Sequence, residues 1–319
     1  MSVLCDDKLV VGYYDGAADA SRIEAWQARL QPYLPSVKLV PLTSRAADEA
    51  MAVMVWNPPL GQLANMPQIK GVISLGQGVD HILRDDSLPS HLPIVRLIDH
   101  DMSVALGHWV CLSVLEMCRH AKDYRALALR REFRPLPQID ARSLKIGVYG
   151  VGAIGHEVVR QLRALSFDVT GYASRPHPDK EYRVLSGEDG LAQMLSEMDV
   201  HVCVMPLTDE TKGFFHKDRF EAMKVGAYFI NAGRGKHVIE NDLLAAIVGG
   251  HLSGASLDVF ETEPLPQDHP FWDNPHITIW PHVAAQTNPE TASEQIAHAL
   301  WAFHTGTTPE NQIHRQKGY

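Results

Sequence analysis

The sequence is short of cysteine and of positive charge, and each shortage excludes a class of protein. Its four cysteines, Cys5, Cys111, Cys118 and Cys203, form no close pair and have no histidine spacing typical of zinc. They indicate buried thiols in a reducing compartment, and we predict no metal site. The formal charge of −9 argues against a nucleic-acid binder, which needs clustered Lys and Arg.

Long apolar runs are also missing. No stretch approaches the roughly 18 apolar residues of a membrane span. The N-terminal MSVLCDDKLVVGYY has acids where a signal peptide carries basic residues. We therefore expect a cytoplasmic protein that binds no membrane. With 319 residues, of which 45% are hydrophobic, the chain is long enough to bury the cores of two domains.

What the sequence does contain is an alternation of short β-rich runs and longer helical runs. Strand candidates are MAVMVW (51–56), GVISL (71–75) and PIVRLI (93–98), followed by a helical segment over 103–120. The pattern restarts with KIGVYG and continues through DVTGYA, DVHVCVMP, AYFINAG, GASLDVF and HITIWP, with helices between them and a last helix over 289–304. Such alternation requires crossover connections and predicts an α/β protein with doubly wound parallel sheets.

The segment YRALALRREFRPLPQIDARSL, residues 124–144, separates the two blocks and carries five Arg. An irregular excursion of this length in a compact enzyme is more often functional than slack. We predict that it joins two subunits, and a simple linker is the alternative.

A glycine-rich turn follows the strand IGVY. Gly150, Gly152 and Gly155 have the Gly-x-Gly-x-x-Gly spacing and open an apolar-periodic helix, which is the context that dinucleotide binding requires. The first glycine permits a tight turn, the second lets the backbone approach a pyrophosphate, and the third lets the helix pack on the strand. The N-terminus of the helix then offers unpaired N–H groups to phosphates, so we predict a dinucleotide site.

The end of the next strand departs from the usual pattern. Ala173 stands near the position where an Asp or Glu would bind the ribose 2′-hydroxyl, and Ser174 and Arg175 follow it. A hydroxyl and a guanidinium suit a 2′-phosphate. We therefore predict NADPH as the preferred cofactor, with NADH possible. The alternative is that Arg175 is a solvated surface charge.

Four polar residues stand at or just beyond the ends of later strands: Arg234 in INAGRGKHV, Asp258 and Glu263 in LDVFETEPLP, and His282 in ITIWPHVAAQT. Each alone has an ordinary structural explanation. Together, at the ligand-binding edge of one nucleotide-binding sheet, they suit a reaction. An Arg can hold a carboxylate, a His can exchange a proton with a carbonyl oxygen, and a Glu can orient that His and favour its protonated form.

Over nearly its whole length the chain resembles the D-isomer-specific 2-hydroxyacid dehydrogenases. SLGQGVDHI resembles the substrate loop of that family, YGVGAIG its cofactor loop and MPLTDETKG the loop flanking the cofactor, while NAGRG, LDVFETEPLP and WPHVAAQT resemble its catalytic segments. Within the family, VWNPP, RPLP and a C-terminal RQKGY are most similar to glyoxylate/hydroxypyruvate reductases.

The resemblance implies two Rossmann-like α/β domains with an interdomain active-site cleft. Residues 1–98 plus 287–319 would form a flavodoxin-like substrate-binding domain, and residues 99–286 the nucleotide-binding Rossmann domain. The implied reaction is NADPH-dependent reduction of small 2-oxo acids, glyoxylate to glycolate and hydroxypyruvate to glycerate, by a homodimer. Arg234, Glu263 and His282 would be catalytic, with His282 as the general acid. Gln77 and Gly78, with Arg234, would bind the substrate. The cofactor would be bound by Gly150, Gly152, Ala153, Ile154, Gly155, Ser174, Arg175, Met205, Pro206, Thr211, Ala232, Gly233 and Asp258.

One departure and several alternatives remain open. Gln77 stands where a small residue is commoner, so it would narrow the substrate pocket or add a polar contact. A D-lactate or phosphoglycerate enzyme of the same family is an alternative, although the chain ends at Tyr319 without the regulatory domain often attached to the latter. Formate dehydrogenation is disfavoured, because relatives with that activity keep an amide in place of Glu263. A dinucleotide-sensing corepressor or scaffold is the non-enzymatic alternative.

Overall fold

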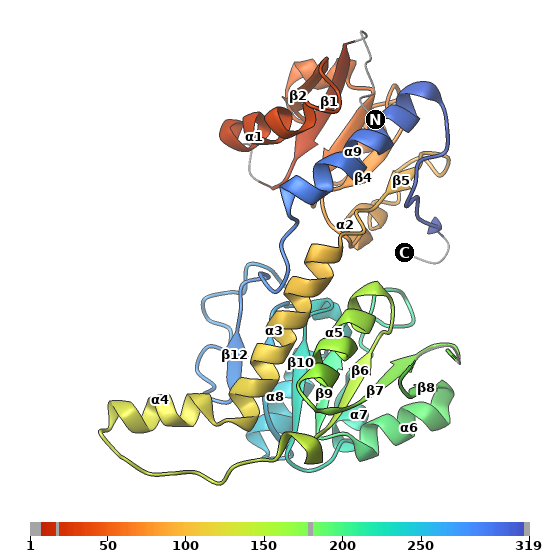
Figure 1. The fold of residues 1–319 in the computed structure, drawn as a ribbon. Coiled ribbons are helices and arrows are strands. Elements are labelled where there is room, and N and C mark those ends of the chain that lie inside the picture. The colour runs from red at the N-terminus through yellow and green to blue at the C-terminus, as the bar shows by residue number, and fades with distance from the viewer. Residues whose placement is uncertain (1–7, 17–18, 178–180, 316–319) are drawn as a thin grey trace. The chain divides into compact units, whose positions relative to one another are not determined.

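The computed structural model describes residues 8–16, 19–177 and 181–315, which fold as two compact units (Figure 1). Unit 1 comprises residues 1–101 and 287–319, and unit 2 comprises residues 102–286. Cys5 and the RQKGY motif beyond Arg315 lie outside the described residues. Both units have parallel sheets, which confirms the predicted α/β class with doubly wound sheets.

Unit 1 is built on a parallel sheet with the strand order β2-β1-β3-β4-β5. Its strands are β1 (Leu9–Tyr14), β2 (Val37–Pro41), β3 (Ala52–Val55), β4 (Val72–Ser74) and β5 (Ile94–Val95). The last three lie within the predicted strands 51–56, 71–75 and 93–98. Helices α1 (Ala20–Leu30) and α9 (Pro289–Thr305) pack on one face, and the short helices η1 (Arg45–Glu49), η2 (Leu63–Asn65) and α2 (Asp80–Leu83) contribute to the core on the other face. Because successive strand side chains enter the cores on opposite faces, the strands read as continuous apolar runs.

The first three elements of unit 1 were not predicted. Helix α1 buries only Ile23 and Leu30 of its 11 residues, so few positions in its sequence mark a buried face. The Asp19 side chain accepts a hydrogen bond from the Ser21 N–H and starts the helix. Tertiary packing of β1, α1 and β2 therefore outweighs a poor local signal.

Unit 2 is built on a seven-stranded parallel sheet with the order β12-β11-β10-β9-β6-β7-β8. Its strands are β6 (Lys145–Tyr149), β7 (Asp168–Ala173), β8 (Val184–Ser186), β9 (Val200–Cys203), β10 (Ala227–Asn231), β11 (Leu252–Leu257) and β12 (Ile277–Ile279). The chain runs outward from β6 to β8 and then returns to β9 on the other side of β6. The strand order thus reverses between β6 and β9, and ligands of open α/β sheets bind at the carboxyl ends of strands at such a reversal.

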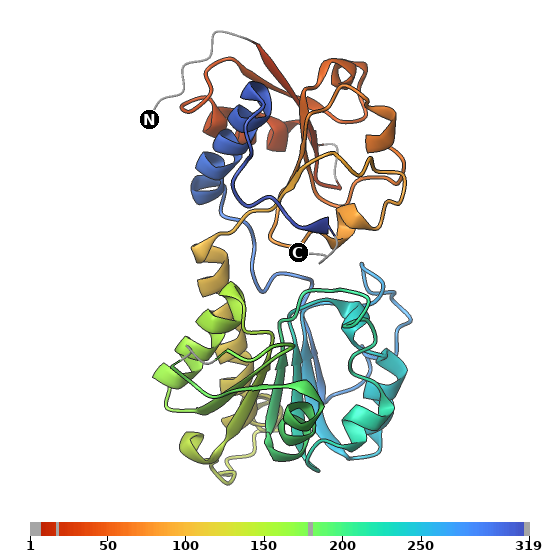
Figure 2. The same ribbon diagram turned by 90° about the vertical axis from the view of Figure 1, so that its right-hand side faces the viewer.

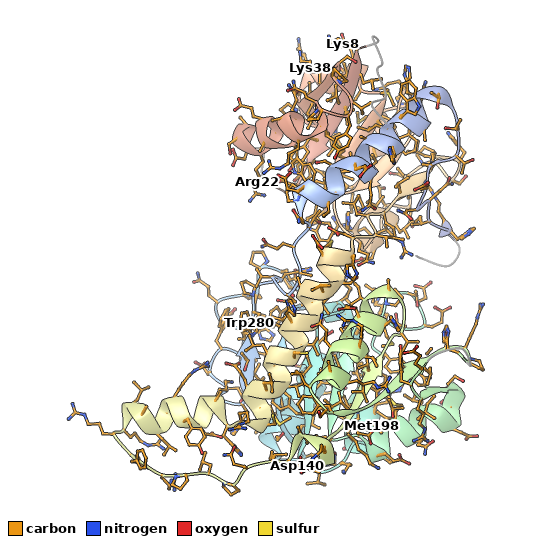
Figure 3. All side chains as sticks on the ribbon, viewed as in Figure 1. Lys8, Arg22, Lys38, Asp140, Met198 and Trp280 are labelled. Atoms are coloured by element: carbon orange, nitrogen blue, oxygen red, sulfur yellow. The ribbon has the colours of Figure 1, made fainter. Side chains whose placement is uncertain are left out.

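Helices cover both faces of this sheet (Figure 2). Helices α3 (His100–Cys118) and α5 (Ala153–Ala164) pack on one face, and α6 (Gly187–Glu197), α7 (Lys217–Glu221) and α8 (Glu240–Val248) pack on the other. Trp280 lies beside α3 (Figure 3) and meets Trp109 edge to face, with 6.1 Å between ring centroids. This packing makes Trp280 part of the core of unit 2.

The predicted excursion begins as a helix. Helix α4 (Ala121–Leu129) and the irregular residues 130–140 extend away from the rest of unit 2 (Figure 1), and the chain rejoins it at η3 (Ala141–Ser143). Asp140, labelled in Figure 3, caps η3 by accepting hydrogen bonds from the backbone and the side chain of Arg142. Leu129 and Phe133 of this arm, residues 121–140, are the most exposed large apolar side chains of the described chain.

The cysteines of the described chain are buried free thiols at positions 111, 118 and 203. Within residues 8–16, 19–177 and 181–315, no group of three His, Cys, Asp or Glu side chains could hold a metal ion. No helix in that same part of the chain is long and apolar enough to cross a membrane.

Candidate active site

The glycine turn has the geometry that the spacing predicts. Gly150 has φ +96°, a conformation that costs a residue with a side chain. A Cβ on Gly155 would lie 1.8 Å from the Gly150 carbonyl oxygen, whereas a Cβ on Gly152 would meet no atom within 4 Å. The turn therefore has no room for a side chain at Gly155, where α5 packs against it, and has open space at Gly152, where the helix begins. The N–H groups at the N-terminus of α5, which start at Ala153 and Ile154, suit a dinucleotide pyrophosphate.

The residues after β7 are exposed at the neighbouring strand end. Ser174 and Arg175 directly follow Ala173, the last residue of β7. Within the described part of the chain, the Arg175 guanidinium has no hydrogen-bond or ion-pair partner. An exposed cation and hydroxyl one strand away from the glycine turn suit a phosphate on the adenosine ribose.

Glu263 and His282 form a hydrogen-bonded pair. His282 Nδ1 lies 2.7 Å from Glu263 Oε2, and Glu263 Oε1 accepts a hydrogen bond of 2.9 Å from the Phe260 N–H. Burial alone would raise the pKa of Glu263, but the hydrogen bond and the charge of His282, with smaller effects from Phe260 and Arg234, lower it overall. The carboxylate therefore stays ionised at neutral pH and holds a proton on Nδ1.

His282 has a strained backbone. Its φ of +55° lies in the left-handed region, which non-glycine residues seldom adopt. Asp258 holds this turn: its carbonyl accepts from the His282 N–H, and its carboxylate accepts from the N–H groups of Val283 and Ala284. Burial raises the pKa of Asp258, and the two N–H groups oppose this effect. Asp258 thus organises the loop that carries His282, which is a role the sequence did not suggest.

Arg234 lies on a turn that is held on both sides. The Asn231 side chain accepts from the Gly233 N–H and donates to the Arg234 carbonyl. The Arg234 N–H donates to Nδ1 of the buried His237 at 3.0 Å. A guanidinium N–H of Arg234 also donates to the Gly233 carbonyl, 2.7 Å away.

Strands β12, β11 and β10 are neighbours, so their carboxyl ends bring His282, Asp258 and Arg234 to one edge of the sheet. Glu263 joins this group through His282 and through the electrostatic effect of Arg234 on its carboxylate. Four of the predicted residues are therefore gathered at a single site in unit 2.

The loop after β9 closes on itself. The Thr211 hydroxyl donates to the Pro206 carbonyl at 2.8 Å and accepts from the Thr208 N–H at 2.8 Å. A Cβ on Gly150 would lie 3.0 Å from Met205 Cα, so this loop lies directly against the glycine turn. Ala232 and Gly233 follow the next strand, β10, at the same edge. The hydroxyl proton of Thr211 is used within the loop, and its contact with a cofactor stays a prediction.

The predicted substrate loop belongs to unit 1. The Ser74 hydroxyl donates to the Gly78 carbonyl at 2.8 Å and lies 3.2 Å from Nε2 of His81, whose Nδ1 accepts from the Asn57 N–H. These bonds hold the turn on which Gln77 and Gly78 stand. The amide oxygen Oε1 of Gln77 is buried and has no hydrogen-bond partner among the described residues.

Four residues that organise these loops were not predicted: Asn231 and His237 in unit 2, and Ser74 and His81 in unit 1. Each stands inside or beside a motif that was singled out, in NAGRGKH or SLGQGVDH. A buried polar residue next to a catalytic turn is the signal that points to such a role.

Comparisons with known proteins identify the family of this chain. The family model described as "D-isomer specific 2-hydroxyacid dehydrogenase, NAD binding domain" matches residues 111–284. The glyoxylate/hydroxypyruvate reductase A of Serratia proteamaculans is 37% identical over 304 residues, which are 93% of this chain and 96% of the relative.

Two solved structures are similar over almost the whole chain. One is a D-isomer specific 2-hydroxyacid dehydrogenase from Xanthobacter autotrophicus Py2 in complex with NADPH and MES, with 32% identity, a TM-score of 0.88 and coverage of 98% of this chain and 99% of that one. The other is an NADPH-dependent glyoxylate/hydroxypyruvate reductase from Sinorhizobium meliloti in complex with NADP and sulfate, with 31% identity, a TM-score of 0.89 and coverage of 98% and 100%.

Proposed function

The chain belongs to the D-isomer-specific 2-hydroxyacid dehydrogenase family, and from this premise we propose that it reduces small 2-oxo acids with NADPH, converting glyoxylate to glycolate and hydroxypyruvate to glycerate. The observation that carries the proposal is the Glu263–His282 pair, 2.7 Å apart, at the same sheet edge as Arg234. The similarity to reductases of this specificity supports the choice of substrates.

In this mechanism the nicotinamide, when bound, would supply a hydride to the carbonyl carbon. His282 donates the proton on Nε2 to the carbonyl oxygen, since its Nδ1–H is held by Glu263. Arg234 binds the carboxylate and offsets the negative charge that grows on the oxygen. The hydrogen bond to Glu263 leaves Nε2 as the ring nitrogen that can give a proton to the substrate.

Unit 2 would hold the dinucleotide. The pyrophosphate would meet the glycine turn and the start of α5, and the 2′-phosphate would meet Ser174 and Arg175. Met205, Pro206, Thr211, Ala232, Gly233 and Asp258 would line the rest of the cofactor. NADH would bind more weakly, because it lacks the phosphate that Arg175 recognises.

Unit 1 would bind the substrate. The backbone N–H groups of Gln77 and Gly78 would hold its carboxylate, which leaves the Gln77 side chain to act on the rest of the molecule. Backbone donors are well suited to this task because they keep their position while the substrate changes.

We also propose that two copies of the chain form a cytoplasmic homodimer through the arm of residues 121–140. The arm extends from unit 2 and exposes 87% of Leu129 and the whole of Phe133, while Leu112 and Leu115 are partly exposed on α3. Apolar side chains presented in this way are typical of a surface that a second molecule covers. Sedimentation analysis of the wild type and of Phe133→Ser tests this proposal, and a monomeric wild type would contradict it.

Initial rates of nicotinamide oxidation test the proposed function. Glyoxylate and hydroxypyruvate are each offered with NADPH and with NADH, and pyruvate serves as the control substrate. We expect fast turnover of the first two with NADPH and loss of most turnover in His282→Ala, but not in the control His276→Ala, which changes an exposed histidine in front of β12. Binding of NADPH without turnover of any 2-oxo acid would favour a sensor instead.

A further inference from the structure

We propose that His237 is a positioning residue for the catalytic arginine: its buried imidazole couples the backbone of Arg234 to the cofactor-flanking loop of residues 205–211. The proposal rests on the proposed function, because it concerns the residue that would bind the substrate carboxylate. His237 does not have to touch a reacting atom for this role.

The histidine bridges two loops that lie far apart in sequence. Its Nδ1 lies 3.0 Å from the backbone N of Arg234, and its Nε2 lies 3.2 Å from the carbonyl oxygen of Pro206. The same carbonyl accepts the hydroxyl of Thr211, which closes the loop 205–211. One side chain therefore connects the turn after β10 to the loop after β9.

The two hydrogen-bond partners of His237 determine which ring nitrogen carries the proton. A backbone N–H can only donate, so Nδ1 carries no proton, and a carbonyl can only accept, so Nε2 carries one. His237 is fully buried, and an imidazole in this tautomer offers one acceptor and one donor at a fixed separation. Leu or Met in place of His237 would leave the Arg234 N–H without an acceptor and the Pro206 carbonyl without this donor.

Close packing gives the ring little freedom. A Cβ on Gly233 would lie 3.0 Å from two atoms of the His237 ring, and a Cβ on Gly235 would lie 1.8 Å from the backbone of Phe260. The His237 carbonyl also accepts from the Phe215 N–H at 2.8 Å. The ring is thus held between the arginine turn and the Pro206 carbonyl, and the backbone around it is held by Phe215 and Phe260.

The bonds to His237 and Asn231 fix the backbone of Arg234. The Asn231 side chain holds the carbonyl of Arg234, and His237 holds its N–H, so both backbone polar groups of the catalytic arginine are bonded to buried side chains. Because both anchors are rigid, the guanidinium starts from a defined position. Without His237 the turn can move relative to the loop 205–211, and a shift of about 1 Å at a reacting centre costs up to roughly 100-fold in rate.

The first experiment compares His237→Leu with His237→Gln. Gln carries an amide acceptor and donor and can restore both bonds, whereas Leu is apolar and restores neither. We expect His237→Leu to raise KM for glyoxylate, to lower kcat, and to reduce kcat/KM by about 10- to 100-fold, with a smaller change in KM for NADPH. His237→Gln is expected to recover most of this loss.

A matched control separates positioning from stability. His251→Leu also removes a histidine that bonds a carbonyl, that of Met223, but it stands at the amino end of β11. It should lower the melting temperature and leave the rate constants of the folded enzyme unchanged. Wild-type kcat and KM in folded His237→Leu, or no recovery in His237→Gln, would overturn the proposal.

A second measurement does not depend on turnover. The ring nitrogens of His237 should show a bare Nδ1 and a protonated Nε2 in ¹⁵N spectra, and hydrogen exchange at the Arg234 amide should be faster in His237→Leu than in the wild type. The opposite tautomer, or unchanged exchange, would overturn the positioning role. If the wild type reduces no 2-oxo acid, the proposed function fails, while these spectra still decide whether His237 holds the turn.

Discussion

Replacing Glu263 with Gln tests the chemistry of the site most directly. The two oxygens of Glu263 each accept one hydrogen bond, Oε2 from His282 Nδ1–H and Oε1 from the Phe260 N–H. An amide has only one oxygen, so one of the two donors must face an NH₂ group instead. The substitution therefore removes the charge and also breaks one of the bonds that orient the imidazole.

The expected fall in kcat follows from the strength of the hydrogen bond that is lost. A hydrogen bond between charged groups contributes about 1.5–3 kcal/mol, and the lower value applies here because each side chain is about one-third exposed, 34% for Glu263 and 33% for His282. A loss of about 1.4 kcal/mol in the transition state lowers a rate constant tenfold. We therefore expect kcat for reduction at neutral pH to fall about tenfold.

The direction of the pH effect follows from the Glu263 carboxylate. Burial raises its pKa, the hydrogen bond and charge of His282 with smaller effects of Phe260 and Arg234 oppose this, and the net pKa is lowered. The carboxylate is therefore ionised at neutral pH, and it loses its charge only as the pH falls through this lowered pKa. The wild type should therefore lose rate at acid pH as Glu263 becomes protonated, and Glu263→Gln should not show that step.

The assay is the pH profile of kcat for glyoxylate reduction by the wild type and Glu263→Gln. Glu261→Gln is the matched control, because it removes an equal charge from an exposed carboxylate two residues away. An unchanged kcat and an unchanged profile in Glu263→Gln would refute the assigned role of this residue.

Other predictions address the cofactor, the fold and the substrate. Arg175→Ala should raise KM for NADPH about tenfold and leave KM for NADH unchanged, and an equal effect on both cofactors would contradict recognition of the 2′-phosphate. Gly155→Ala places a Cβ 1.8 Å from the Gly150 oxygen, so NADPH binding, measured by fluorescence titration, should be lost; retained affinity would contradict the close crossing of α5. Burial lowers the pKa of His201 from its ordinary value of 6.5 to about 3, which means that the folded state favours the neutral ring and loses stability as the pH falls below 6.5. Urea unfolding should show about 2 kcal/mol more loss between pH 7 and pH 5 in the wild type than in His201→Gln, and equal losses would argue against this burial effect. Gln77→Ala should lower kcat/KM for hydroxypyruvate about fivefold relative to glyoxylate, because the buried amide oxygen would accept a hydrogen bond from the 3-hydroxyl; an unchanged ratio would exclude that contact.

Much of unit 2 could be predicted because its signals are local. The glycine turn requires only the spacing of three glycines between a strand and a helix. Arg234, Asp258 and His282 each stand at or beyond the end of an apolar run, and parallel strands bring such ends to one edge. In unit 1, by contrast, β1, α1 and β2 went unpredicted, since α1 buries only two of its 11 residues and these gain stability only from packing.

The residues that organise the site could not be predicted in the same way. His237 bonds a carbonyl 31 positions away, and His81 accepts from an N–H 24 positions away. Asp258 was predicted to bind the cofactor, which stays a prediction, and its carboxylate also holds two N–H groups 25 and 26 residues along the chain. A histidine or an aspartate gives no period or spacing that marks such a partner.

The amino-acid sequence by itself determined the α/β class, the position of the glycine turn and the residue types at the strand ends, because strands, turns and helix starts depend on neighbouring residues. Only the tertiary structure decided the hydrogen-bond partners of Glu263, Asp258 and His237, together with the left-handed backbone of His282. These features arise where buried polar groups from distant segments must satisfy one another in the absence of water, and that requirement exists only once the chain has folded.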